Sequence, residues 1–340
     1  MNLTPVISAQ DLDIGYRSNK TGHIGIQRGL HIALYPGELT CLLGANGAGK
    51  STLLRTLSGF QPPLKGTISI NNIPLGQISK RDLSHLIGIV LTDRTSIGGL
   101  TAYEVVALGR QPHTGFFGHL SRLDDEIVHN ALTACGIATK AHEFMASLSD
   151  GERQKVMIAK AIAQECPIVI LDEPTAFLDV VSRIEIMSLL HNIAAEQNRA
   201  ILLSTHDIEQ ALVLGDRLWL LSREYGLQTG VTEDLILSGA FDRLFPHAAI
   251  HFDPLHGSFY PTVSRQHIVN VVCHDETLLH WVVNILNRNG YAANIATGDK
   301  TTHSLLHIVS PHDITWHSDT EQLSFTSFEK LALFLKEKKA

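Results

Sequence analysis

The chain has 340 residues, 44% of them hydrophobic and 18% charged, and a formal net charge of −7. This length allows one large domain and a small one, and the composition is that of a globular protein. The negative charge argues against a nucleic-acid-binding function, because no basic face is needed to explain the composition. No apolar run is long enough to cross a bilayer, and residues 1–10 lack the layout of a signal peptide. We therefore expect a cytoplasmic protein that reaches a membrane only through a partner.

The four cysteines are scattered along the chain, at Cys41, Cys135, Cys166 and Cys273. Their spacing suggests neither a disulfide framework nor a zinc site. The 19 histidines are dispersed as well. We expect core thiols and surface imidazoles.

Short strand-like runs alternate with turns containing Gly, Pro or Asn in the first third of the chain. These runs are residues 6–14, 30–34, 39–43, 67–70 and 87–91. A helical pattern follows over residues 101–165, and then come two buried-strand signals separated by a helical stretch. The two signals are residues 168–171 and 201–204. This order predicts an α/β sheet interrupted by a helical insert at about residues 93–165, within a domain that spans residues 1–261.

A second, small α/β domain is predicted for residues 262–340. Residues 268–273 have the pattern of a strand, and residues 277–289 that of an amphipathic helix ended by Gly290. Further strand-like runs precede a last helix, which we expect to begin at a capping box formed by Thr326 and Glu329.

A phosphate-binding loop is predicted at residues 44–51, where the sequence GANGAGKS fits the pattern G-x-x-x-x-G-K-[ST]. An apolar run precedes it, and a helix is expected to begin near Lys50. The glycines of the loop let backbone N–H groups face a phosphate, and the helix directs its positive end toward the same place. Lys50 would reach the β- and γ-phosphates, and Ser51 would offer a hydroxyl to Mg²⁺. The expected nucleotide contacts are Gly44, Asn46, Gly47, Ala48, Gly49, Lys50, Ser51 and Thr52.

Residues 168–173, IVILDE, form an apolar strand that ends in two carboxylates, which resembles a Walker B segment. Asp172 would hold Mg²⁺, and Glu173 would orient and deprotonate the attacking water. A solvated acidic turn is the alternative, but the upstream phosphate loop argues against it.

Residues 148–154, LSDGERQ, resemble the signature sequence of ABC ATPases, with Asp150 in place of the first of its two glycines. Ser149 and Glu152 also form a capping box, which predicts the start of a helix. In this family the segment reaches ATP bound to a second subunit. The resemblance therefore implies that Ser149 and Gly151 bind the partner's nucleotide in a head-to-tail homodimer with two composite sites.

Three further positions extend the resemblance to ABC ATPases, which covers about residues 3–260. Residues 176–179 resemble the D-loop, which places Asp179 at the dimer interface, and His206 resembles the switch histidine that contacts the γ-phosphate. Tyr16 lies where an aromatic ring stacks on adenine, although a half-buried strand tyrosine remains the alternative. The resemblance implies a P-loop NTPase fold with a RecA-like core, an antiparallel β subdomain and a helical insert. It also implies an ATPase that uses ATP and Mg²⁺, with Lys50, Glu173 and His206 as catalytic residues.

One departure concerns the glutamine that family members carry at the end of the strand before the insert. Here Thr92 stands at that place and is followed by Asp93. Either residue could replace the glutamine as a ligand of Mg²⁺, or the loop has lost this contact. We favour a replaced ligand.

Residues 100–113 resemble the start of the insert in importers of iron–siderophore, haem and cobalamin complexes, in which V-x-x-G-R-x-P-[HY] recurs. This resemblance implies an ATPase at the cytoplasmic face of the membrane, with an integral permease and a periplasmic or surface substrate-binding protein as partners. A groove near residues 92–110 would receive a coupling helix of the permease. The alternative for these residues is an amphipathic helix ended by Gly109 and Pro112.

Other functions with the same nucleotide motifs stay open. They are an exporter ATPase, a soluble non-transport ABC protein, and a module that holds ATP without hydrolysing it. The importer-like insert, the single phosphate loop and the presence of Glu173 and His206 favour an importer ATPase over these alternatives. The C-terminal domain could bind a regulatory small molecule, stabilise the dimer or do neither.

Overall fold

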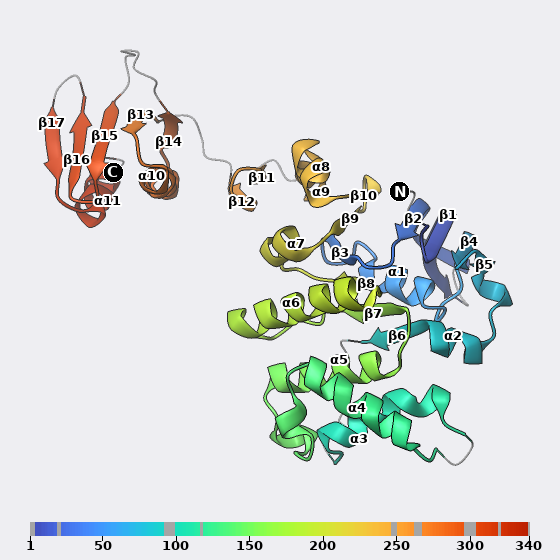
Figure 1. Cartoon of the computed structure of the whole chain (residues 1–340). Coiled ribbons are helices and arrows are strands. Elements are labelled where there is room, and N and C mark those ends of the chain that lie inside the picture. The colour runs from blue at the N-terminus through green and yellow to red at the C-terminus, as the bar shows by residue number, and fades with distance from the viewer. Residues whose placement is uncertain are drawn as a thin grey trace. The chain divides into compact units, whose positions relative to one another are not determined.

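The computed structural model describes residues 4–18, 22–91, 99–115, 118–245, 250–261, 267–295, 304–318 and 321–338. Its internal contacts divide the chain into two units (Figure 1). The first contains the described residues up to 245 together with Phe252–Ser258, and the second contains residues 250–251 and the described residues from Phe259 onward. None of the helices in the described part of the chain is long and apolar enough to span a bilayer.

A six-stranded sheet in the order β10-β9-β3-β8-β7-β6 forms the centre of the first unit. Its strands are β3 (Leu39–Gly44), β6 (Ile87–Val90), β7 (Ile168–Asp172), β8 (Ala200–Ser204), β9 (Arg217–Ser222) and β10 (Gly226–Gly230). All neighbouring strands are parallel except β10, which runs antiparallel to β9. The continuous apolar runs that predicted β3, β7 and β8 suit parallel strands, because these are covered on both faces. Parallel pairing places the carboxyl ends of these strands at one edge of the sheet.

A second, antiparallel sheet has the order β2-β1-β4-β5. It consists of β1 (Ile7–Ser18), β2 (Gly22–Leu34), β4 (Lys65–Ile70) and β5 (Ile73–Pro74). β1 and β2 are longer than the sequence pattern predicted, because register shifts interrupt their alternation of side chains. One hydrophobic cluster joins this sheet to β3, β7, β8 and β9, so that the two sheets share a core with α1 (Lys50–Leu57).

The helical insert follows β6 and contains three α-helices that pack on one another. These are α3 (Ala102–Ala107), α4 (Arg122–Ala134) and α5 (Asp150–Ala163), with short 3₁₀ turns η2 (Leu108–His113), η3 (Ala138–Lys140) and η4 (Met145–Ser147) between them. Four helices and a hairpin come later in the described part of the chain. They are α6 (Val180–Gln197), α7 (Ile208–Leu214), α8 (Thr232–Leu237), α9 (Ala240–Leu244) and the hairpin of β11 (Ile250–Asp253) and β12 (Ser258–Pro261). Before β6, the short elements η1 (Leu75–Gln77) and α2 (Lys80–Leu86) lead out of the antiparallel sheet.

Part of the motif that suggested an importer is buried in the interior of this insert. Arg110 is only 3% exposed, and its Nη1 donates to the carbonyl of Ala163 (2.7 Å) and to the Glu165 carboxylate (2.7 Å). Its Nε donates to Asp124 Oδ1 at 2.8 Å. A Cβ on Gly109 would lie 2.3 Å from the carbonyl oxygen of Lys160, so only glycine lets η2 approach α5 this closely. The guanidinium thus satisfies a carbonyl at the C-terminus of α5, where a cation is favoured.

Asp124 has its carboxylate fixed from two sides. Its Oδ2 accepts hydrogen bonds from the hydroxyl (2.6 Å) and the amide (2.9 Å) of Ser121, which caps α4. These bonds, together with the bond from Arg110, lower the pKa of Asp124 to about 2. The ionised form that pairs with Arg110 is therefore stabilised at neutral pH.

The second unit contains a five-stranded sheet in the order β14-β13-β15-β16-β17. Its elements are β13 (Ile268–Cys273), α10 (Glu276–Arg288), β14 (Ala292–Ile295), β15 (Leu305–Ser310), β16 (Asp313–His317), β17 (Gln322–Phe325) and α11 (Phe328–Glu337). Both helices contribute to one core with the sheet, in which Trp316 is 1% exposed.

Two helix boundaries in this unit test the sequence patterns. Gly290 has a φ of 83° just beyond α10, which confirms it as the stop signal. The prediction of a capping box at Thr326 is wrong. α11 begins one residue later, because the side chain of Ser327 accepts from the amide of Lys330, while the Thr326 hydroxyl bonds to the Lys330 ammonium group. Two adjacent hydroxyl residues made the position ambiguous.

Replacing Arg110 by Met should destabilise the first unit by about 3 kcal/mol or more, because the change leaves the buried Asp124 carboxylate without its cation. Urea unfolding followed by circular dichroism would measure the free energy. The matched control is Arg122→Met, whose side chain is 94% exposed and pairs with Glu126 on the surface, so that its loss should barely change the unfolding midpoint. Equal effects of the two substitutions would contradict a special role of Arg110.

Candidate active site

The carboxyl ends of three neighbouring parallel strands bring the predicted catalytic residues together. β3 leads into the loop at residues 44–51, β7 ends at Asp172, and β8 ends two residues before His206. In the register of the sheet, Ser204 lies between Leu42 on one side and Asp172 on the other. The loop, the acidic pair and the histidine therefore share one edge of the sheet.

The loop has the backbone shape that its glycines predicted. Gly47 and Gly49 have φ values of 74° and 109°, in the left-handed region that side chains disfavour. α1 begins at Lys50, as expected, and no side chain caps its N-terminus. Its first amides and its positive end are therefore directed at the place where the motif predicts a phosphate.

Two residues outside the motif hold the loop from its outer side. The amide of Gln27, on β2, donates to the carbonyls of Ala48 (3.0 Å) and Ser222 (2.8 Å). Arg223, in the turn after β9, donates from Nε to the carbonyl of Gly47 at 3.0 Å. When the N–H groups of such a loop face a phosphate, its carbonyls point away and need donors of their own. No local motif indicates Gln27 or Arg223. Gln27 is 4% exposed on β2, where the other buried side chains, Leu30, Ile32 and Leu34, are apolar.

Lys50 lies inside the loop and is 6% exposed. Its Nζ donates to the carbonyl of Gly44 at 2.8 Å and lies 3.3 Å from Nε2 of His206. Burial lowers the pKa of Lys50, while the negative charges of Glu173 and Asp172 oppose this shift. A phosphate group bound here would stabilise the ammonium ion that burial disfavours.

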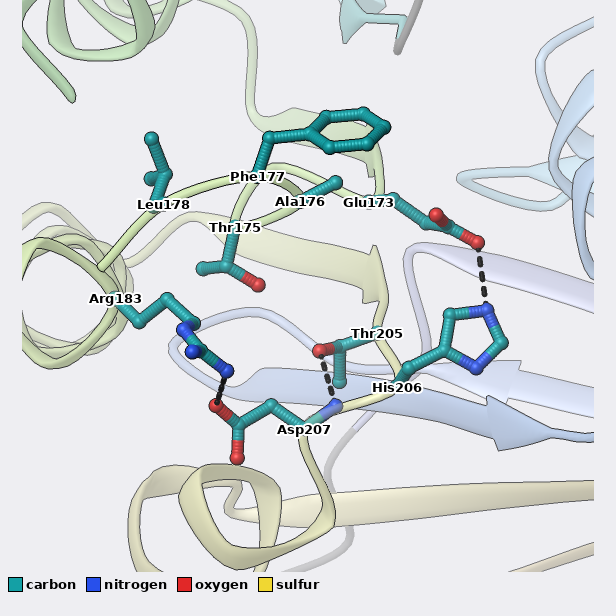
Figure 2. Close-up of a pocket in the computed structure, with 9 residues that line it drawn as sticks. All are labelled: Glu173, Thr175, Ala176, Phe177, Leu178, Arg183, Thr205, His206 and Asp207. Carbon is teal, nitrogen blue, oxygen red and sulfur yellow. Dashed lines mark hydrogen bonds and ion pairs between the residues drawn. The ribbon is translucent and has the colours of Figure 1, made fainter. Parts of the chain in front are cut away.

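Glu173 and His206 contact each other directly. Nε2 of His206 lies 2.9 Å from Oε1 of Glu173 (Figure 2). One ring nitrogen cannot donate to Glu173 and accept from Lys50 at the same time, so the tautomer decides which contact is a hydrogen bond. The structure thus places the expected phosphate-binding cation, the expected base and the expected sensor in one contiguous group.

A cavity of about 300 Å³ adjoins this group on the side of the predicted D-loop. Its lining residues are Glu173, Thr175, Ala176, Phe177, Leu178, Arg183, Thr205, His206 and Asp207. In Figure 2 the Glu173–His206 pair lies to one side of it, and Arg183 pairs with Asp207 at 3.4 Å on the other. Phe177, in the predicted D-loop, is 78% exposed.

The remaining predicted nucleotide contacts lie on separate elements. Tyr16, on β1, is 45% exposed, and its hydroxyl lies 2.8 Å from the Thr52 hydroxyl on α1. This bond connects Tyr16 to the helix that follows the phosphate loop. Stacking on adenine stays a prediction.

The residues expected to reach the partner's nucleotide stand at helix N-termini. Ser149 caps α5 through a reciprocal capping box with Glu152, which confirms the predicted helix start. Asp179 caps α6 by accepting from the amide of Ser182 (2.7 Å), a bond that lowers its pKa. A Cβ on Gly151 would lie 3.0 Å from the Ser182 hydroxyl, so the starts of α5 and α6 are neighbours.

The metal ligands were expected at Ser51, Asp172, Thr92 and Asp93. Thr92 and Asp93 lie outside the described residues, so their role stays a prediction. No cluster of three or more His, Cys, Asp or Glu in the described part of the chain has the geometry of a metal site. Mg²⁺ bound with a nucleotide does not need such a cluster, because phosphate oxygens and water supply most of its ligands. A hydroxyl and a carboxylate, as offered by Ser51 and Asp172, fit this ion.

Comparison with known protein families supports this interpretation of the site. The model of the family described as ABC transporter matches residues 27–176. An uncharacterized ABC transporter ATP-binding protein of Methanocaldococcus jannaschii is 35% identical over 254 residues, which cover 75% of this chain and 86% of that protein. The iron(3+)-hydroxamate import ATP-binding protein of Bacillus subtilis is 33% identical over 73% of this chain and 91% of its own length. A cobalamin import ATP-binding protein of Halobacterium salinarum is 34% identical over 67% of this chain and 57% of its own length.

Solved structures agree with the sequence relatives. A chain of an ABC transporter described as of the metal-chelate type, in an inward-facing conformation, has a TM-score of 0.62 and 28% identity, covering 75% of this chain and 95% of that one. A dimeric ATP-binding cassette in a post-hydrolysis state with ADP and phosphate has a TM-score of 0.57 and 26% identity, covering 66% and 98%. The phosphate loop, the acidic pair and the histidine at one sheet edge, taken with these relatives, show that the chain belongs to the ATP-hydrolysing ATP-binding proteins of ABC transporters.

Proposed function

We propose that this subunit powers the import of a metal chelate, which is an iron–siderophore complex, haem or cobalamin. The names of the iron-hydroxamate and cobalamin relatives support this class of cargo, as does the metal-chelate type of the structural neighbour. The contiguous group of Lys50, His206 and Glu173 beside the phosphate loop supports the ATP hydrolysis that would power this import.

The roles of the site residues follow from their chemistry. Lys50 neutralises the β- and γ-phosphates, Glu173 orients and deprotonates the attacking water, and His206 contacts the γ-phosphate. The residues that bind the nucleotide are Tyr16, Gly44, Asn46, Gly47, Ala48, Gly49, Lys50, Ser51 and Thr52. Ser51 and Asp172 would hold Mg²⁺, with Thr92 or Asp93 in place of the usual glutamine, and the ion would supply charge stabilisation to the phosphates.

Two copies of the chain act together in this proposal. Ser149 and Gly151 of one copy bind the nucleotide of the other, and Asp179 lies at the interface between them in a head-to-tail dimer. The capped N-terminus of α5 suits this role, because it presents a helix dipole to a phosphate. The dimeric cassette among the structural neighbours supports the assembly. ATP closes the dimer, and loss of the γ-phosphate lets it reopen.

The partners are an integral membrane permease, contacted from its cytoplasmic side, and a periplasmic or surface substrate-binding protein. Gly109 and Arg110 are buried, so they support the surface of the insert but do not contact the permease themselves. The second unit is a candidate for regulation or for stabilising the dimer.

Glu173→Gln should lower the kcat of ATP hydrolysis by about 100-fold or more, because it removes the general base, while ATP binding persists. Lys50→Ala should instead weaken ATP binding itself. Steady-state phosphate release and binding of a fluorescent ATP analogue would separate the two effects. Glu126→Gln, on the outer side of α4, is the control. Unchanged hydrolysis by Glu173→Gln would refute the assignment of the base.

Deleting the gene should abolish uptake of one labelled cargo among an iron–siderophore complex, haem and cobalamin. Wild-type protein should restore this uptake and Lys50→Ala should not, because transport needs the nucleotide. Cell-associated radiolabel over time is the measurement. If all three uptakes continue in the deletion strain, the metal-chelate assignment is wrong, although the ATPase assignment would stand.

A further inference from the structure

Ser204 lies at the centre of the sheet edge on which the proposed chemistry depends. It is the last residue of β8, is 0% exposed, and is paired in register with Asp172 of β7. We propose that Ser204 is a positioning residue that sets the orientation of both acidic residues, Asp172 and Glu173. This inference rests on the proposed catalytic role of Glu173.

The Ser204 hydroxyl makes two hydrogen bonds with opposite directions. It donates to Oδ1 of Asp172 at 2.6 Å and accepts from the backbone amide of Glu173 at 2.9 Å. A serine hydroxyl has a single hydrogen to donate, and its lone pairs remain free to accept. The bond to the carboxylate is charge-assisted and therefore stronger than a neutral one. One buried atom thus fixes a side chain and the backbone of the next residue.

Glu173 needs such support because its backbone is strained. Its φ is 50°, in the left-handed region that residues other than glycine seldom adopt. Such a conformation persists only where surrounding contacts hold it. Without the hydroxyl, the Glu173 amide would lose its acceptor, and an extended conformation would turn the carboxylate away from the phosphate loop.

The end of β8 and the residues after it contact both the backbone and the side chain of Glu173. Ser204 bonds to its amide, and His206, two residues further on, lies 2.9 Å from its carboxylate. A general base must be held closely in its productive geometry, so a loose backbone at Glu173 should slow the reaction. Ser204 itself contacts neither the phosphate loop lysine nor the histidine through these bonds. It acts through the two residues that it orients.

The test is a set of substitutions that separate the hydroxyl from the shape of the side chain. Ser204→Ala should lower kcat by about 10- to 100-fold, less than removal of the general base itself, while the KM for ATP changes less than about threefold. The side chains of Thr and Val have nearly the same shape, but only Thr keeps the hydroxyl. Ser204→Thr should therefore retain a clearly higher kcat than Ser204→Val. Thr40→Val is the control. It removes a buried hydroxyl from the adjacent strand β3, and this oxygen has no hydrogen-bond partner among the described residues.

Two readouts distinguish positioning from a general loss of structure. Binding of a fluorescent ATP analogue in EDTA should stay unchanged in Ser204→Ala, because the phosphate loop does not depend on this serine. Half-saturation by Mg²⁺ should shift to higher concentration, because the Asp172 carboxylate loses the hydrogen bond from Ser204. In a Glu173→Gln background at saturating Mg²⁺, Ser204→Ala should lower the residual rate much less than in the wild type, since the part of its effect that acts through the Glu173 carboxylate is already lost.

The outcomes separate this inference from the proposed function. If Glu173→Gln abolishes hydrolysis but Ser204→Ala does not reduce kcat, the role of Ser204 is refuted and the ATPase mechanism stands. Equal rates for the Thr and Val variants, or weaker nucleotide binding in EDTA, would also refute it. If Glu173→Gln hydrolyses ATP normally, the proposed base itself is wrong.

Discussion

The hydrogen bonding between the parallel strands β3, β8 and β7 is the constraint on which the rest of the site depends. It places Leu42, Ser204 and Asp172 in one row, so that the loops after all three strands leave the same edge. Each strand contributes a different chemical group: β3 leads into the phosphate loop, β8 into His206, and β7 into the two carboxylates. A slip of one residue in the register would turn the Ser204 hydroxyl to the other face of the sheet, away from Asp172.

Residues outside the phosphate loop and its own lysine hold the loop in its curled shape. Its outward carbonyls accept hydrogen bonds from Gln27 and Arg223, and its lysine is held against the carbonyl of Gly44. These contacts come from β2 of the antiparallel sheet and from the turn after β9 of the parallel sheet, and the two sheets also share one hydrophobic core. Such preorganisation lets inward N–H groups meet a phosphate without first reordering the backbone.

The helical insert has its own internal constraint, which is independent of the nucleotide. Arg110 connects η2, α4 and the end of α5, while the start of the same helix α5 carries Ser149. α5 therefore has a buried ion pair beside one end and the residues proposed to reach a second subunit at the other. The pattern that suggested an importer thus includes two residues, Gly109 and Arg110, that are buried inside the insert.

The sequence by itself predicted the features that depend on neighbouring residues. These were the phosphate loop with its helix at Lys50, the strand ending in Asp172 and Glu173, and the capped helix at Ser149, because spacing within a few residues determines turns, caps and periodicity. The tertiary structure alone decided the contacts of Gln27, Arg110 and Ser204 with distant residues, such as the 195-residue separation between Gln27 and Ser222. Local patterns also left an ambiguity of one residue at the last helix, where Ser327, not Thr326, became the cap. Strand register and helix packing bring together residues that no local spacing relates, so those contacts appear only when the sheets and the insert are folded.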